Sequence, residues 1–328
     1  MKIRNILITS AALLFSAASI SASPVTSTIA HTWVSGSGSD SNPCTFASPC
    51  ATFAGALANT SAGGLITAKD AGDFGQVSIS KSVTIDGSNL GSITISGNND
   101  AIYITTSVNV TLRNLTINGL GSLFYGIYDR DGGTLIVNNC DLENIAFAGV
   151  SFSGAGNLTV ENSRIESFIG GGATIGIEIA ANAAQYVVVK NTVIDASPIS
   201  AGNYGLVISS GAGFVQASLQ NVTIMGAGLE AVYAQTGNTQ ITGSVITQSN
   251  YGVVANGATI SVASSMITAN TTGVCSTTGS KIRLDNNDIY DNTTAIANCG
   301  GTYKTSGTNR TSGAINATAA EVSNSVLF

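Results

Sequence analysis

An eight-residue pattern that recurs every 21–30 residues constrains the fold of this chain more than any other feature of its sequence. In each copy, apolar residues alternate with other residues, an Asn or a small residue occupies the fifth position, and an apolar residue closes the pattern. Such alternation is typical of β-strands, whose successive side chains point to opposite faces. The copies are Val110–Ile117, Leu135–Leu142, Leu158–Ile165, Val187–Ile194, Ala217–Ile224, Thr239–Ile246, Ile260–Ile267 and Ile282–Ile289.

The stretches between the copies indicate how the strands are connected. A second short motif, with Gly or Ala before a β-branched residue or Leu, follows each copy, and clusters of Gly, Asn, Ser and Thr separate the motifs. No stretch between the motifs has helical periodicity, so alternating strands and helices are disfavoured. Strands that repeat at this period stack as turns of a solenoid. Because parallel crossovers prefer the right hand, the sequence predicts an all-β fold, a right-handed parallel β-helix of about ten or eleven turns.

The fifth position of the pattern predicts a ladder of asparagines along one edge of the solenoid. Asn tolerates the unusual backbone angles of a sharp bend, and stacked Asn side chains can bond to one another through their amides. We therefore expect the chain to bend between two strands at this position, with neighbouring turns about 4.8 Å apart. The ladder residues are Asn114, Asn139, Asn162, Asn191, Asn221 and Asn286.

The two ends of the chain lack the repeat. Residues 1–22 have basic residues at their start, then an apolar stretch and a small residue at the end, which is the layout of a secretory signal peptide. We therefore expect the protein to be exported to the periplasm, the cell surface or the medium. Residues 23–62 are predicted to be an N-terminal extension with a short capping helix, 63–303 the β-helix, and 304–328 a C-terminal cap or tail.

Charge and hydropathy argue against several classes of protein. The chain has 12 basic and 18 acidic residues, a net charge of −6, and it lacks the clustered Lys and Arg that nucleic acids and anionic membranes require. Beyond residue 22, no apolar run approaches the ~18 residues of a membrane-spanning helix. We expect no nucleic-acid partner and no transmembrane segment in the mature chain.

The five cysteines can form disulfides if the chain is exported. Cys44 and Cys50 are close in sequence within a Pro-containing loop, and we predict that they pair. Cys275 and Cys299 lie on adjacent turns but two residues out of register, about 8 Å apart in an undistorted sheet. A bulge between the two turns would close this gap, and we predict the bond. Cys140 directly follows a ladder Asn, at a position expected to be buried, and we predict a core thiol and not a nucleophile because no His accompanies it.

The Asn ladder, the aliphatic alternation and the predicted N-terminal helix together resemble the pectin-lyase-like superfamily of right-handed β-helices, across roughly residues 60–303. The segment from Thr32 to Cys50 also resembles the start of secreted bacterial β-helix repeat proteins without an assigned function. The superfamily includes polysaccharide lyases, hydrolases, esterases, phage tailspikes and adhesins. The resemblance therefore implies the fold and leaves the activity open.

Outward residues of the second motif form one candidate site. Hydrolases of the superfamily use clustered Asp residues with a His, whereas this chain has no Asp-Asp pair and its single histidine, His31, precedes the first turn. Lyases of the superfamily use calcium held by carboxylates, with an Arg or Lys as base. The candidate catalytic residues are Arg130, Asp129, Asp131 and Glu178, and the candidate binding residues are Tyr128, Glu178 and Tyr233. The competing interpretation is a polar turn, with Asp129 at an inward-facing position, followed by a solvated face.

A second candidate site is the acidic segment that contains Asp285, Asp288 and Asp291. Carboxylate and amide oxygens are the ligands that Ca²⁺ prefers, and several Asn residues lie in the same segment. The spacing matches neither an EF-hand loop nor a Gly-Gly-x-Gly-x-Asp repeat. The competing interpretation is therefore a set of outward polar residues around a turn.

Two functions fit these observations. The favoured one is an exported, non-catalytic scaffold that binds a polysaccharide, a cell-surface glycan or another partner, because charges are sparse and the outward positions are mostly Ser, Thr, Asn, Ala and Val. The other is a polysaccharide lyase acting on acidic glycans, with calcium as its cofactor. The sequence does not decide whether the protein is an enzyme.

Overall fold

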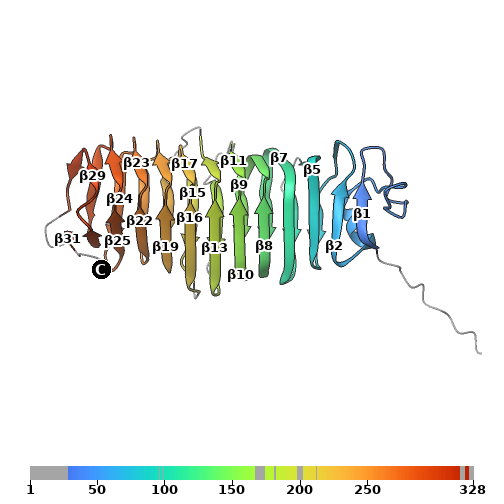
Figure 1. The fold of residues 1–328 in the computed structure, drawn as a ribbon, viewed down its shortest axis with the longest axis horizontal. Helices are drawn as coiled ribbons and strands as arrows, with labels where there is room; N and C mark the ends of the chain where they lie inside the picture. Colours follow the sequence, from blue (N-terminus) through green and yellow to red (C-terminus); the bar gives the residue numbers. More distant parts are fainter. Residues whose placement is uncertain are drawn as a thin grey trace, which may run out of the picture.

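The computed structural model describes residues 29–324, apart from 96, 98, 167–173, 181, 198–201, 212 and 318–321. Its strands stack as a parallel β-solenoid of about ten turns, elongated along the stacking direction (Figure 1). The all-β parallel solenoid predicted from the repeat is thus confirmed. The predicted signal peptide, residues 1–22, lies outside the described residues.

Three sheets run along the solenoid, and the long strands β5, β7 and β9 bend from one sheet into the next. The first sheet contains β1 (Ile29–Val34), β2 (Thr60–Ala68), β5 (Val83–Thr94), β7 (Val108–Asp129), β8 (Gly132–Asn138), β10 (Ala155–Glu161), β13 (Gln185–Lys190), β16 (Val215–Gln220), β19 (Asn238–Thr242), β22 (Thr259–Ala263), β25 (Lys281–Asp285), β28 (Thr302–Thr305) and β31 (Val322–Asn324). The second contains β3 (Gly72–Asp73), later parts of β5 and β7, the start of β9 (Asp141–Phe152), β11 (Arg164–Glu166), β14 (Val193–Asp195), β17 (Thr223–Met225), β20 (Val245–Thr247), β23 (Met266–Thr268), β26 (Asp288–Tyr290) and β29 (Arg310–Thr311). The third contains β4 (Val77–Ile79), β6 (Ile102–Ile104), the ends of β7 and β9, β12 (Ile175–Ala180), β15 (Tyr204–Ser209), β18 (Glu230–Ala234), β21 (Tyr251–Ala255), β24 (Thr272–Thr277), β27 (Thr294–Cys299) and β30 (Ala314–Ile315).

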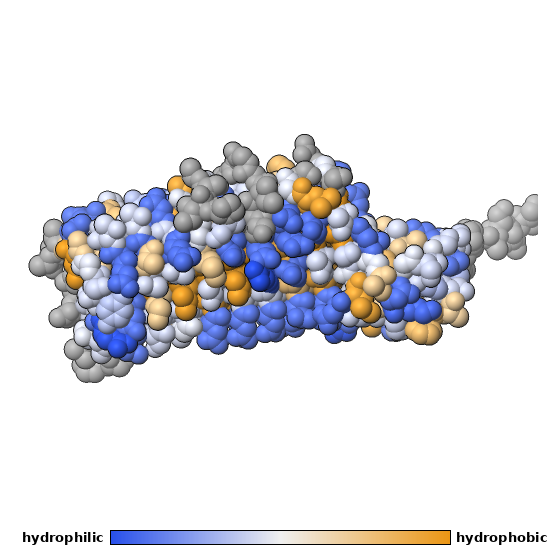
Figure 2. Space-filling view, turned by 90° about the horizontal axis from the view of Figure 1, so that it is seen from above, coloured by the Kyte–Doolittle hydropathy of each residue, from blue (hydrophilic) through white to orange (hydrophobic). Residues whose placement is uncertain are grey.

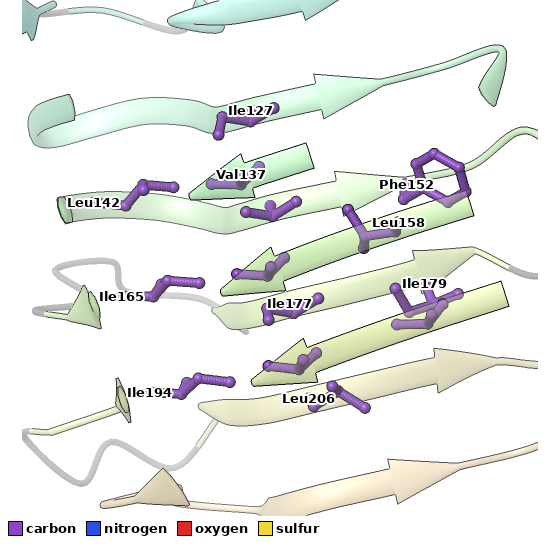
Figure 3. Packing of buried hydrophobic residues seen from close by; sticks show 14 of the residues in the cluster. Ile127, Val137, Leu142, Phe152, Leu158, Ile165, Ile177, Ile179, Ile194 and Leu206 are labelled. Carbon is purple, nitrogen blue, oxygen red and sulfur yellow. The ribbon is translucent and has the colours of Figure 1, made fainter. Parts of the chain in front are cut away.

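The interior of the solenoid is a stack of aliphatic side chains (Figure 3). Leu142, Ile165 and Ile194 lie in register on successive turns, and all three are fully buried. Burying a side chain of this size contributes about 1.5–3 kcal/mol. Since each turn contacts only its neighbours, stability accumulates along the stack, and this is why the apolar alternation persists through the sequence.

The predicted asparagine ladder lies at the bend between the first and second sheets. Its six members have φ between 47° and 57°, in the left-handed region that Asn tolerates. Neighbouring amides bond to each other: the Nδ2 atom of Asn139 donates to Oδ1 of Asn114 at 2.7 Å, and that of Asn191 to Oδ1 of Asn162 at 3.2 Å. Figure 2 views the molecule from the top of Figure 1, and the row of hydrophilic residues along its lower edge follows this bend.

A short helix, α1 (Phe53–Asn59), lies at the N-terminal end and packs against β1, β2 and β4. It begins after Thr52, whose side chain accepts the Gly55 N–H, and the side chains of Phe53 and Leu57 are buried, as the sequence predicted. No helix in the described part of the chain is long and apolar enough to cross a membrane.

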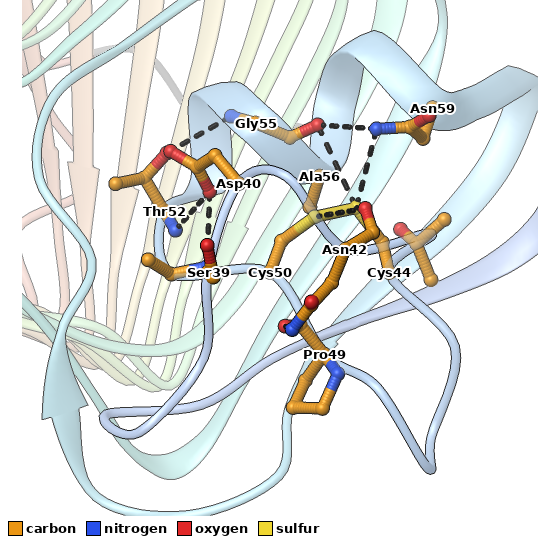
Figure 4. The surroundings of a disulfide bond; sticks show 12 residues. Ser39, Asp40, Asn42, Cys44, Pro49, Cys50, Thr52, Gly55, Ala56 and Asn59 are labelled. Atoms are coloured by element: carbon orange, nitrogen blue, oxygen red, sulfur yellow. Dashed lines mark hydrogen bonds between the residues drawn. A yellow bond between two sulfur atoms is a disulfide. The ribbon is translucent and has the colours of Figure 1, made fainter.

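The loop before α1 is held by the predicted disulfide between Cys44 and Cys50 (Figure 4), whose Cα atoms are 4.6 Å apart. In the same loop, the Asp40 carboxylate accepts hydrogen bonds from the backbone N–H and the hydroxyl of Thr52, at 2.9 and 2.8 Å. The loop and the start of the helix are therefore joined by a covalent bond and by charge-assisted hydrogen bonds.

Strand pairing continues beyond residue 303, where the sequence predicted an irregular cap or tail. β28, β29, β30 and β31 each pair in parallel with a strand of the preceding turn. Ser, Thr, Asn, Gly and Ala make up most of residues 304–328, so the apolar alternation fades although the backbone still forms its ladder. The strand ladder therefore extends beyond the end of the apolar pattern.

The predicted bond between Cys275 and Cys299 is present, and their Cα atoms are 5.7 Å apart. The register between β24 and β27 shows no bulge, because Cys275 pairs with Ala297 and Thr277 with Cys299. An antiparallel bridge joins Thr277 to Gly300, whose φ is +84°. The chain turns sharply just after Cys299. The two Cα atoms accordingly lie closer together than the value of about 8 Å that we expected for a flat sheet.

Cys140 is buried and unbonded, as predicted for a core thiol. Burial raises the pKa of this thiol to about 12. The reactive thiolate is therefore strongly disfavoured at neutral pH, and Cys140 has the character of a packing residue.

Candidate functional site

The outer surface of the third sheet carries most of the tyrosines. Six of the nine tyrosines in the chain lie on strands of this sheet. Five of them form the surface that we name the tyrosine face: Tyr103, Tyr125, Tyr128, Tyr204 and Tyr233.

In the third-sheet strands from β12 to β27 the second residue is Gly or Ala, directly after the position that Tyr204 occupies in β15. Gly176 is typical: a Cβ atom there would lie 2.4 Å from the side chain of Ile194 and 2.5 Å from the carbonyl oxygen of Gly205. Only a small residue fits this close approach between sheets. The residue before this Gly or Ala carries its side chain on the outer surface, and Tyr204, which precedes Gly205, occupies this place.

Aromatic rings gather at the N-terminal end of the tyrosine face. The ring of Tyr128 stacks on those of Tyr103 and Tyr125, with centroid distances of 5.4 and 4.5 Å. Phe124, 44% exposed, stacks on Phe147 at 4.8 Å. A groove of about 370 Å³ runs beside these rings and is lined by Tyr103, Phe124, Tyr125 and Tyr128 together with Asp100 and neighbouring polar residues. The cluster exposes aromatic surface in a groove open to solvent.

Tyr128, Glu178 and Tyr233, the three binding candidates from the sequence, lie in one outward row. The register places them on the same line across the third sheet, with Ser151 and Val207 between them. The Ser151 hydroxyl donates a hydrogen bond of 2.8 Å to the Glu178 carboxylate. Farther along the face, the ring centroids of Tyr204 and Tyr233 are 6.2 Å apart.

Partial burial raises the pKa of several titrating groups on this face. Burial raises the pKa of Asp100 and of Glu230, the residue aligned with Tyr204 on the next turn. Burial, followed by the charge of Glu178, also raises the pKa of Tyr125. The tyrosine hydroxyl therefore stays protonated, and it can donate a hydrogen bond at any physiological pH.

Arg130, the candidate base, is held at the edge of the face. Its guanidinium forms two hydrogen bonds to the Asp131 carboxylate, at 2.9 and 3.1 Å, and donates to the Tyr103 hydroxyl at 2.9 Å. The Asp131 hydrogen bond and charge raise the pKa of Arg130, and the Arg130 hydrogen bond lowers the pKa of Asp131. A general base must release its proton near the working pH, so this ion pair shifts Arg130 away from that role.

Asp129 points into the solenoid and is fully buried. It stacks in register between Ile104 and Phe152, and its Oδ1 atom accepts the Gly132 N–H at 2.8 Å, while Oδ2 has no partner. Burial raises the pKa of Asp129 to about 6. Its inward direction, which the sequence parity suggested as an alternative, separates it from Asp131 and Glu178 on the outer surface.

Two of the three carboxylates of the acidic segment bind separate partners, and the third is exposed. Asp288 forms an ion pair with Arg310, and Asp285 accepts a hydrogen bond from Thr308 at 3.2 Å, while Asp291 is exposed. Among the described residues, no three His, Cys, Asp or Glu side chains form a group that could hold a metal ion. The neighbouring Asn287 and Asn292, expected to be outward, are buried.

Sequence reasoning missed Tyr103, Tyr125 and Tyr204 as parts of the face. Tyr125 and Tyr204 stand at the first position of the second motif, directly before its Gly, and this placement was a readable signal. Tyr103 lies on an early turn where the repeat is loose, and only its pairing with Tyr128 brings it to the face.

Comparison with solved structures shows the fold of the chain in proteins of low sequence identity. The structure titled pectate lyase Pel9A has 13% identity over 91% of this chain and 79% of its own, with a TM-score of 0.56. The A-module of the Azotobacter vinelandii mannuronan C-5 epimerase AlgE4 has 17% identity over 78% of this chain and 81% of its own, with a TM-score of 0.49.

Comparison with protein families identifies the family to which the chain belongs. A search of curated proteins found no match. The profile described as the right-handed beta helix region matches residues 66–216 and 204–317, which is most of the chain. Together with the parallel solenoid, this match shows that the chain belongs to the right-handed β-helix family.

Proposed function

We propose that this protein is an exported, non-catalytic scaffold that binds a polysaccharide along the tyrosine face. The observation that carries the proposal is the row of half-buried aromatic side chains on the third sheet, beside a solvent-open groove. Aromatic rings offer flat apolar surfaces of the kind that the C–H faces of sugar rings can cover. A β-helix face extends in one direction, as a polysaccharide does.

The polar groups between the rings support the same ligand. Glu178 and Glu230 supply hydrogen-bond acceptors, and the tyrosine hydroxyls supply donors, so the face can pair with sugar hydroxyls. Apolar surface with a few placed polar groups is typical of small-molecule and glycan sites. The solved structure of similar fold titled a pectate lyase adds an analogy to polysaccharides at the level of fold alone.

A calcium-assisted lyase is the competing proposal, and two observations weigh against it. Arg130, its candidate base, is paired with Asp131, which raises its pKa. Asp129, one of its candidate carboxylates, is buried inside the solenoid. Scaffold binding requires neither a free base nor a converging set of carboxylates.

Export is part of the proposal. Its support is the layout of residues 1–22 and the two disulfides, Cys44–Cys50 and Cys275–Cys299, because disulfides persist in oxidising compartments. We also propose the division into a signal peptide (1–22), an N-terminal extension (23–62), a β-helix and a C-terminal cap.

The test is binding of the mature protein to a panel of polysaccharides, measured by affinity electrophoresis and calorimetry. Tyr128→Ala should weaken binding about 10-fold, equivalent to about 1.4 kcal/mol, since it removes the ring at the centre of the stack. Tyr186→Ala is the matched control, because Tyr186 is 59% exposed but lies on β13 of the first sheet. Equal affinities of the two variants would contradict the placement of the site.

The same panel separates binding from lyase activity. Unsaturated products are followed by their ultraviolet absorbance, with Ca²⁺ or with EDTA. We expect no product with any polymer. Calcium-dependent product that disappears in Arg130→Ala would replace the scaffold proposal with the lyase.

A further inference from the structure

Charged side chains on and beside the tyrosine face are mainly acidic. Among the described residues, no Lys or Arg lies in the part of any strand that belongs to the third sheet, whereas Glu178 and Glu230 lie on β12 and β18. Asp100 lines the groove beside the stacked rings. The acids of this face thus lie on a surface whose strands supply no cation to balance them.

Two basic groups that follow third-sheet strands at the N-terminal end of the face already have partners. Arg130 follows β7 directly, and its guanidinium contacts Asp131, Tyr103 and the carbonyl oxygen of Thr105. Lys81, which follows β4 closely, donates to the carbonyl oxygen of Thr60 at 2.6 Å. Four of the five N–H donors of Arg130 are engaged and its charge is balanced by Asp131, whereas Lys81 keeps two of its three N–H donors.

The acids themselves have accepting capacity left. Glu178 has a hydrogen bond from Ser151, and a carboxylate accepts several. The Oε2 atom of Glu230 is buried and lacks a donor. Hydroxyl groups of a sugar are such donors, whereas a uronate carboxylate is an acceptor with the same charge as the face.

We infer that the ligand of the tyrosine face is an uncharged polysaccharide and not a polyuronate. The inference rests on the proposed function and adds the chemical class of its ligand. An uncharged chain places C–H faces on the rings and donates hydroxyl hydrogens to Glu178 and Glu230. A polyuronate would bring its carboxylates against these two carboxylates on a partly buried face, where repulsion between like charges is strong. The net charge of −6 adds repulsion at longer range.

The test compares polymers that differ in charge on the same backbone. Polygalacturonate and its fully methyl-esterified form are measured at low salt by calorimetry, alongside a neutral glucan and a neutral mannan. We expect a neutral polymer to bind at least about 10-fold more tightly than polygalacturonate, and the gap to narrow as salt screens the repulsion. Tighter binding of polygalacturonate, in EDTA or only with Ca²⁺, would overturn the inference and leave the proposed function standing. Failure of every polymer to bind would overturn the proposed function itself.

Variants of the acids locate the discrimination. Glu178→Gln with Glu230→Gln should raise affinity for polygalacturonate about 10-fold or more, because both negative charges are removed while an acceptor oxygen remains at each position. Glu161→Gln is the matched control, since Glu161 lies on β10 of the first sheet and bonds to Asn138 at 2.9 Å. An unchanged preference in the double variant with a folded, glucan-binding protein would contradict the role of these two carboxylates.

Discussion

The bend between the first and second sheets is built differently in the two halves of the solenoid. In the N-terminal half, Asn114 and Asn139 occupy the bend and the next residues inward are Leu115 and Cys140, both buried. In the C-terminal half the residues one place after the bend are polar instead, and they are buried: Ser244, Ser265 and Asn287. The inner ladder thus begins at Ser163 and Thr192, behind the outer asparagines, and it is continuous from Ser244 toward the C-terminal end.

The inner ladder binds the backbone, whereas the outer one binds itself. The Ser265 N–H donates to Oδ1 of Asn287, and the Asn287 N–H donates to Oδ1 of Asn309. A second inner ladder runs along the bend between the second and third sheets, where the Asn270 N–H donates to Oδ1 of Asn292. Because buried N–H groups are costly to leave unpaired, the inner ladders stabilise each turn more than the solvated amides of the outer ladder do.

The largest expected effect is the loss of an inner amide. Asn287→Ala removes the acceptor of the Ser265 N–H and the donor to the carbonyl oxygen of Val262, leaving buried groups unpaired. We expect the free energy of unfolding to fall by about 2–4 kcal/mol, measured by urea denaturation. Asn286→Gly is the control at the adjacent outer position, where φ is +50° and Gly fits, and it should cost much less. Similar losses in both variants would break the comparison.

Asp129 tests the opposite case, a buried polar group at a bend with one oxygen unpartnered. Its pKa is raised to about 6 in the fold, against 3.8 as the ordinary value, so the folded state binds the proton more tightly than the unfolded state. The stabilisation is therefore complete below about pH 4 and is lost as pH rises through 6, by up to about 3 kcal/mol. Asp129→Asn keeps an acceptor for Gly132 and should remove this dependence. Thermal unfolding of both proteins between pH 4 and 8 measures it, and parallel curves would contradict the assignment.

The smallest effect is expected in the outer ladder. Asn162→Gly removes one exposed amide at a φ of +53°, which Gly adopts without strain. Its hydrogen bonds to neighbouring amides are exposed and compete with water, so the free energy of unfolding should change by less than about 1 kcal/mol. A loss as large as that of Asn287→Ala in the same denaturation series would show that the two ladders are equivalent.

Much of the fold was predictable because the repeat encodes it locally. Alternation fixes which side chains face inward, and Asn at the bend supplies the left-handed conformation, so Asn162 and Ile165 could be placed from their own neighbours in sequence. Cys44 and Cys50 could be paired because they are only six residues apart in one loop. The inner ladder was not predicted, although Asn287 follows a ladder Asn as Cys140 does, because its polar side chain suggested an outward direction that the packing does not show.

The candidate site depends on contacts between turns, and this explains why it was only half predicted. Sequence alone determined the parity that puts Tyr128, Glu178 and Tyr233 on one face. The tertiary structure decided that Tyr103, 25 residues before Tyr128, stacks on it, and that Asp131 holds Arg130. The physical reason is that a strand sets the direction of its own side chains, while the neighbours of a side chain are set by register with turns 21–30 residues away in the chain.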